Sequence, residues 1–250
     1  MNIANDKKTS YNKEELLNFN TDYSHNEIIE NLKSNSEDFI KIFSIINLEK
    51  TENIDEVELL FKHLTDHPTP IREAIALKLE EIYDENFFNN FIKEQFLKAI
   101  IDINPNVCRA MCNIISRSEF LKEILLNELL FKTINLLKEI KENNKELGNF
   151  YEDAQKVRKN HAKNKKLFSL YWYLEVLSIC TERKSNSEVL EIVKEVIKFN
   201  DYTIREKAAK ILSGIENAPI DLLKLAKIDQ NFYVKNLVYD KINFEIDKRK

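Results

Sequence analysis

Glycine is the residue whose scarcity most constrains this fold: the 250 residues contain two, Gly148 and Gly214, beside four prolines. Tight β-hairpins and bulges draw on glycine, and doubly wound α/β folds place it in their phosphate-binding turns. Neither GxGxxG nor GxxxxGK(S/T) can be written in this sequence. Apolar residues instead recur at spacings of three and four almost to the end of the chain, which is the helical period. We therefore predict an all-α fold.

The composition is that of a folded helical protein, and the charge balance does not favour nucleic-acid binding. Hydrophobic residues make up 43% of the chain, which allows a buried core, and charged residues reach 32%, which suits long helices with solvated faces. Residues 1–60 hold 6 Lys and Arg against 13 Asp and Glu, whereas the remaining residues hold 32 against 29. Domains that bind nucleic acid are usually strongly basic, so this balance does not favour that class.

The cysteines and the amino terminus indicate a reducing compartment. Cys108, Cys112 and Cys180 form an odd set without CxxC spacing. The first ten residues lack the apolar core of a signal peptide. The most apolar run, 167–180, is short and interrupted by Glu175, so it cannot span a bilayer. We expect a cytoplasmic protein with no membrane partner.

Four segments of the chain share one pattern, which indicates internal repeats. They are residues 68–79, 104–115, 201–212 and 231–242. In each segment a β-branched residue, which we call the anchor, is followed directly by a basic residue or a cysteine. A pair of hydrophobic residues then lies four and five positions after the anchor. The anchors and their followers are Ile71 and Arg72, Val107 and Cys108, Ile204 and Arg205, and Val234 and Lys235.

This pattern resembles the second helix of a HEAT repeat, in which a turn with Asp, Asn or Pro precedes Val-Arg and paired small residues. Neighbouring anchors lie 36 and 30 residues apart, near the HEAT period of about 40. The resemblance covers about residues 55–245. It implies a right-handed, armadillo-type α-solenoid of roughly five to six HEAT-like helix pairs, because one pair cannot bury its apolar face alone.

The repeats also predict the domain organisation. We expect a flexible tail at residues 1–10 and a single solenoid domain over 11–250, with capping helices over 11–54. Val107 and Ile204 are 97 residues apart, which leaves room for one long helix pair or two irregular ones. We expect an irregular basic connection over 143–165 and an inner helix over 165–179. Gly214 follows a predicted helix at 203–213, where a left-handed cap is needed.

The basic residue after the anchor has two interpretations. Arg72, Arg205 and Lys235 could line a concave face that grips an acidic partner. The resemblance to HEAT repeats instead implies a ladder in which such residues pair with acidic residues of neighbouring repeats, and we favour the ladder. The acidic residues at comparable places are Asp66, Asp201 and Asp229.

The segment 156–166 is the best candidate for a ligand site. It carries six Lys and Arg, one His and no acid, and it runs directly into Phe168, Tyr171 and Trp172. Phosphate backbones and stacked bases exploit cations beside aromatic rings. The alternative, which we favour, is a solvated connection followed by aromatic residues buried in the core. The candidate binding residues are Arg109, Lys163, Lys165, Lys166, Tyr171 and Trp172.

Zinc and catalytic chemistry have weaker support. His63 and His67, and likewise Cys108 and Cys112, are four residues apart and are zinc-ligand types. Cys112, however, takes the small-residue position that Ala209 holds in another repeat, which favours a buried structural cysteine. The sequence contains no HExxH and no GxSxG. We predict no catalytic residue, no metal site and no cofactor.

The predicted function is a non-enzymatic scaffold or adaptor that binds a protein or peptide partner on the concave face of the solenoid. The first alternative is a nucleic-acid-binding protein similar to the HEAT-like DNA glycosylases. Trp172 is the sole tryptophan, with Glu175 three positions on, which departs from the aromatic-rich pattern of that group. The second alternative is a lyase or chaperone resembling the HEAT-like bilin lyases, for which the sequence contains no chromophore-binding motif.

Overall fold

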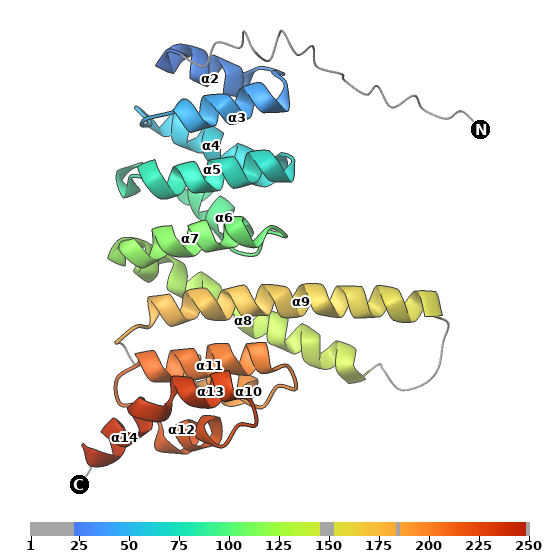
Figure 1. Cartoon of the computed structure of the whole chain (residues 1–250), viewed down its shortest axis with the longest axis vertical. Coiled ribbons are helices and arrows are strands. Elements are labelled where there is room, and N and C mark those ends of the chain that lie inside the picture. The colour runs from blue at the N-terminus through green and yellow to red at the C-terminus, as the bar shows by residue number, and fades with distance from the viewer. Residues whose placement is uncertain (1–22, 146–152, 184–185, 249–250) are drawn as a thin grey trace.

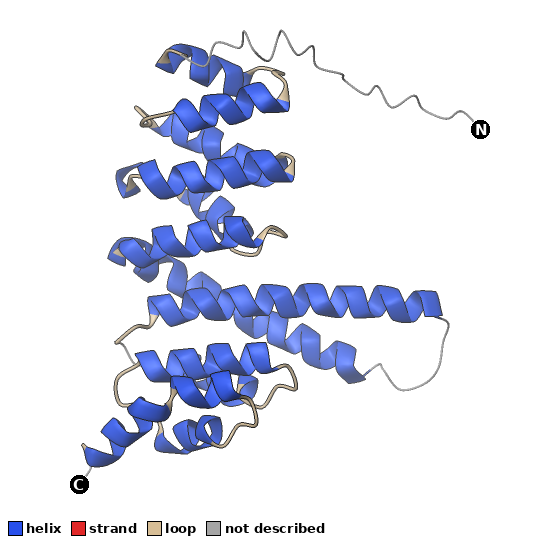
Figure 2. Cartoon of the chain, viewed as in Figure 1, coloured by secondary structure: helices blue, strands red, loops and turns tan. Residues whose placement is uncertain are grey.

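The computed structural model describes residues 23–145, 153–183 and 186–248. Within these ranges every regular element is a helix (Figure 2), and all are α-helices except the short 3-10 helix η1 (Glu85–Phe87). The prediction of an all-α fold is confirmed. None of the helices in the described ranges combines the length and the apolar character needed to cross a membrane.

The helices form hairpins that stack on one another in two layers (Figure 1). The first helices of the hairpins, which we call the back layer, are α2 (His25–Lys33), α4 (Ile54–Asp66), α6 (Asn90–Ala99), α8 (Glu119–Lys145), α10 (Ser187–Val196) and α12 (Ile220–Lys227). The second helices, the front layer, are α3 (Asp38–Asn47), α5 (Thr69–Ile82), α7 (Pro105–Arg117), α9 (Asp153–Cys180), α11 (Tyr202–Gly214) and α13 (Phe232–Leu237). Each front-layer helix packs on the one before it, and α14 (Tyr239–Asp247) closes the stack against α12 and α13.

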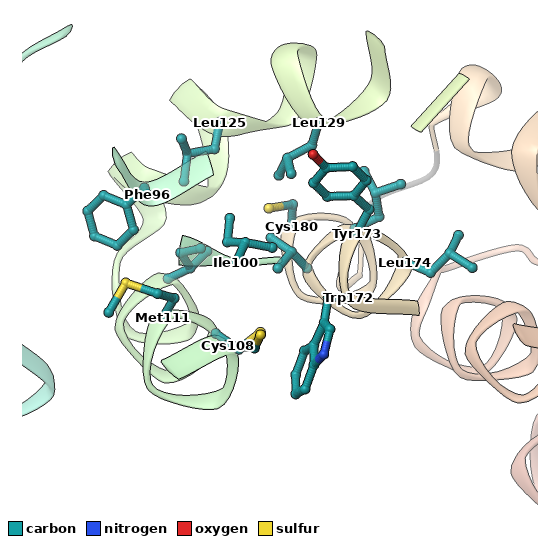
Figure 3. Close-up of a cluster of buried hydrophobic side chains, with 14 of the residues drawn as sticks. Phe96, Ile100, Cys108, Met111, Leu125, Leu129, Trp172, Tyr173, Leu174 and Cys180 are labelled. Carbon is teal, nitrogen blue, oxygen red and sulfur yellow. The ribbon is translucent and has the colours of Figure 1, made fainter. Parts of the chain in front are cut away.

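The core runs between the two layers as one cluster of buried side chains. Figure 3 shows part of it, where Tyr173 of α9 points toward Leu129 of α8. Both residues are buried, as are Leu174 of α9 and Met111 of α7. Since each hairpin contributes an apolar stripe that the next hairpin covers, the stack shares a continuous core.

Helix starts in the front layer follow the repeat pattern. The residue three positions before the anchor is the N-cap of its helix, and in three repeats its side chain accepts a backbone N–H two residues on. These caps are Asn104 for α7, Asp201 for α11 and Asn231 for α13. A cap of this kind stabilises a helix by about 1 kcal/mol, because it satisfies an N–H that has no partner within the helix.

Arg72 and Arg205 each join one hairpin to the next through an ion pair with an aspartate, and we call each of these two ion pairs a clamp. Arg72 Nε and Nη2 donate to the two carboxylate oxygens of Asp102 at 2.8 and 3.0 Å. Arg205 Nε and Nη2 bind Asp229 in the same way at 2.6 and 3.0 Å. In each pair the arginine follows the anchor of one repeat, and the aspartate lies five residues before the anchor of the next.

The predicted ladder is therefore confirmed at these two junctions, although the partner of Arg72 is Asp102 rather than Asp66. The other aspartate predicted for the ladder, Asp201, caps α11 instead. The guanidinium of Arg205 lowers the pKa of Asp229 through its hydrogen bond, so the aspartate stays ionised at neutral pH.

The structure corrects two predictions about the chain's boundaries. Residues 143–145 belong to α8 and residues 153–165 to α9, so they are helical and not an irregular connection. Lys, Arg, Gln and Ala favour helix even where no apolar period exists, which explains the error. Gly214 is the last residue of α11, and its φ is not positive. The cap is Ile215, whose backbone is extended and whose N–H donates to the carbonyl of Ile211, so no left-handed residue ends this helix.

Several predicted segments lie partly or wholly outside the described ranges. The tail at 1–10, residues 11–22 of the capping region and residues 146–152 lie outside the described ranges. Helices α2 and α3 occupy the rest of the predicted capping region and form the first hairpin of the stack. The right-handed sense of the solenoid stays a prediction.

We expect Arg205→Lys to lower the free energy of unfolding by about 1 kcal/mol or more, because an ammonium cannot make the paired N–H contacts to Asp229. Urea denaturation followed by circular dichroism measures the change. Lys198→Ala, which removes an exposed cation from the same hairpin, serves as the control and should alter stability little. Equal stability of Arg205→Lys and wild type would show that the clamp contributes nothing.

Candidate functional site

A groove of about 510 Å³ opens on the front layer, where α9 lies between the N-terminal ends of α7 and α11. We call it the α7/α9/α11 groove. Its lining residues are Pro105 and Arg109 of α7, Asn164, Leu167, Phe168, Tyr171 and Trp172 of α9, and Asp201 and Thr203 at the start of α11.

Helix α9 supplies one side of the groove through residues spaced by three and four. Asn164, Leu167, Phe168 and Tyr171 lie on one face at this spacing. Trp172 extends the same face, and Figure 3 shows its indole pointing away from α8, opposite to the ring of Tyr173. One face of α9 thus builds the core, while the adjacent face builds the groove.

The structure brings together three of the six predicted binding residues. Arg109, Tyr171 and Trp172 all line the groove, although they come from different hairpins. Lys165 is exposed and does not line it. The Lys166 ammonium forms an ion pair with Glu139 of α8 at 2.9 Å. Lys163 belongs to α9, and its side chain lies outside the described residues.

Sequence reasoning missed the contribution of the helix starts. Pro105, Asp201 and Thr203 line the groove because α7 and α11 present the same end toward α9. The repeat alignment contained this signal, since it places Asn104 beside Asp201 and Asn106 beside Thr203. Only the position of α9 between the two helices was missing.

Within the described ranges, Arg109 has unused hydrogen-bond donors, whereas Oδ1 of Asp201 is engaged. The exposed guanidinium of Arg109 donates from Nη1 to Asn106 at 2.8 Å, and a guanidinium carries five N–H donors. The buried Nε1 of Trp172 has no partner among the described residues. Asp201 Oδ1, by contrast, accepts both the backbone N–H and the hydroxyl of Thr203.

A charged cluster lies beside the groove between α9 and α11. The carboxylate of Glu175 binds the ammonium of Lys207 at 2.7 Å and that of Lys210 at 2.5 Å. Lys207 Nζ also lies 4.2 Å from the centroid of the Tyr171 ring, in a cation–π contact. One carboxylate binds two ammonium groups, so these three side chains together carry one net positive charge.

The protonation states of this cluster follow from its contacts. Burial by itself would raise the pKa of Glu175, but the hydrogen bonds and charges of the two lysines outweigh it and lower the pKa. Burial would likewise lower the pKa of Lys207, and the hydrogen bond to Glu175 reverses this and raises it. Both groups are therefore ionised at neutral pH.

The residues considered for zinc do not form a common site. His63 and His67 stack with ring centroids 4.1 Å apart. The two ring nitrogens of His63 face the carbonyl oxygens of Leu59 and Leu32. The pKa of the Cys108 thiol is raised to about 12, mainly by burial. Burial is also the largest cause of the raised pKa of the Cys112 thiol. Thiols that stay protonated are poor nucleophiles and poor metal ligands.

In the described ranges, one group brings together three side chains of metal-ligand type, namely His25, Glu52 and Glu56. Glu56 Oε2 accepts the backbone N–H of Glu52 at 2.8 Å, and Oε1 accepts the Asn53 amide at 2.9 Å. His25 Nε2 lies 3.2 Å from the same Oε1. These contacts tie the start of α4 to α2, which accounts for the cluster as a helix-capping network.

We expect Glu175→Gln to lower the free energy of unfolding at pH 7 by about 2–4 kcal/mol, because Lys207 would be left buried without a counter-charge. The folded-state pKa of Glu175 is below its usual 4.5. Its stabilisation is thus complete above pH 4.5 and is lost as the pH falls through the folded pKa. Urea denaturation between pH 7 and pH 3 should show wild type and variant converging. A difference independent of pH would contradict the assignment.

No family model matches this chain, and no curated protein matches its sequence. The α7/α9/α11 groove is thus interpreted from its own geometry and charge.

Proposed function

We propose that this protein is a non-enzymatic scaffold or adaptor of HEAT-like repeats, and that it binds a protein or peptide partner in the α7/α9/α11 groove. The observation that carries the proposal is the groove itself, which gathers Arg109, Tyr171 and Trp172 from separate hairpins. Arginine, tyrosine and tryptophan are the residue types most enriched among those that dominate binding energy at protein interfaces.

The repeat assignment rests on two kinds of equivalent contact. Arg72 with Asp102 and Arg205 with Asp229 have the same paired geometry at the same repeat positions. The N-caps Asn104, Asp201 and Asn231 also occupy one repeat position. Chains that repeat both sequence and contacts in this way are solenoids, which use extended surfaces rather than deep pockets to bind partners.

The shape of the groove suits a chain segment better than a small metabolite. It is open to solvent; its aromatic and aliphatic side chains come mainly from α9, and polar side chains come from all three helices. Phe168 and Tyr171 supply partly buried apolar rings, and Arg109 and Asn164 supply exposed polar groups. A peptide can place one side chain against the rings while its backbone bonds to the polar groups.

The test is an affinity pull-down from native lysate, with and without nuclease, using wild type and the double variant Arg109→Glu/Tyr171→Ala. We expect a stoichiometric protein partner that survives nuclease and is lost with the variant, because both the charge and the ring of the groove are removed. Melting curves of both proteins are recorded to check that the variant is folded.

Lys62→Glu is the matched control, since it makes the same charge change on an exposed position of α4 in the back layer. It should recover the partner as wild type does. A partner retained by the double variant would place binding elsewhere on the protein. A partner that disappears with nuclease would instead support the nucleic-acid alternative.

A further inference from the structure

Two residues of the groove lining have hydrogen-bond donors without a partner in the described part of the chain. Arg109 presents an exposed guanidinium that donates one hydrogen bond to Asn106. Trp172 lines the groove, and its Nε1, a donor only, has no partner in the described part of the chain. A ligand rich in acceptor oxygens complements such a wall, because an N–H left without a partner costs free energy on burial.

The charged cluster beside the groove carries a net positive charge. Lys207 and Lys210 share the single carboxylate of Glu175, and the Lys207 ammonium lies against the ring of Tyr171. Within the groove lining itself, the cation is Arg109 of α7. The opposing charge is Asp201, whose carboxylate accepts two hydrogen bonds from Thr203 at the start of α11, where the helix dipole offsets a negative charge.

The walls between these cations are apolar. Leu167, Phe168 and Tyr171 line the groove along α9, and all three are partly buried against the core. An aliphatic or aromatic side chain placed here would remove their remaining surface from water. Arg109 belongs to α7 and these apolar residues to α9, so an anionic group of the ligand would lie next to the apolar side chain and not in its place.

The position of the lysine-rich segment argues against a polyanion as the occupant. Lys166 is paired with Glu139, and Lys165 lies outside the groove lining. Nucleic acid requires a track of cations along its backbone, in addition to aromatic rings. Among the described residues, the lining of the groove provides a single cation, Arg109, and no such track.

Building on the proposed function, we infer that the α7/α9/α11 groove binds an acidic peptide segment, in which one or more Asp or Glu residues flank a bulky apolar residue. A carboxylate of the peptide pairs with Arg109, the cation of the groove lining. The apolar side chain packs on Phe168 and Tyr171. Complementary charge of this kind selects the partner and excludes basic segments.

A random library of peptides displayed on phage tests the inference without assuming a sequence. The library is selected on the wild-type chain and depleted on Arg109→Glu. We expect the enriched peptides to be acidic and to carry Leu, Ile or Phe beside the acidic residues. Enriched peptides that are neutral or basic would overturn the inference and leave the proposed function standing. A library with no groove-dependent enrichment would overturn both.

A consensus peptide without tryptophan then allows a direct measurement, because Trp172 is the only tryptophan of the chain and lines the groove. Titration should change its fluorescence. We expect Arg109→Glu, or replacement of the peptide's Asp and Glu by Asn and Gln, to raise the Kd about ten-fold or more. Lys62→Glu should leave the Kd unchanged. Unaltered affinity of the amide peptide would overturn the inference, as would displacement of the peptide by a single-stranded oligonucleotide at equal affinity.

Discussion

Each hairpin of this protein buries its apolar stripe against the next hairpin, and the rest of the structure depends on that contact. A single pair of helices of this length cannot enclose a core, so several hairpins must stack before one forms. The contact is reinforced from outside the core by the clamps of Arg72 with Asp102 and of Arg205 with Asp229. Because each clamp joins residues at fixed repeat positions, it sets the same register between hairpins at both places.

The groove lies where this regular arrangement is interrupted. Cys108 takes the position of the clamping arginine on α7, and its thiol donates to the carbonyl of Asp102 instead. Phe199 takes the position of the clamping aspartate before α11. Helix α9, at 28 residues, is far longer than α7 or α11, and it extends beyond both (Figure 1). Because α9 is longer than α7 and α11, and no Arg–Asp pair of this kind among the described residues joins it to either helix, the groove stays open at the N-terminal ends of α7 and α11.

Polar contacts replace the missing clamp between α9 and α11. Glu175 holds Lys207 and Lys210, and Lys207 in turn covers one face of Tyr171. The same ion pairs that fasten α11 to α9 hold two ammonium groups against one carboxylate beside the groove. A protein that needed stability alone would gain as much from apolar contacts at this junction.

The local features of this protein could be predicted from its sequence, whereas the contacts between distant segments depend on how the hairpins stack. The helical period, the repeat anchors and the arginine ladder could be predicted because they depend on neighbours within one or two turns or on a repeated pattern. The helical state of residues 153–165 could not, since a polar segment carries no apolar period to mark it. Nor could the meeting of Arg109, Tyr171 and Asp201, or the binding of two lysines by Glu175. Those contacts join residues far apart along the chain, and they exist only because stacking places α9 between α7 and α11.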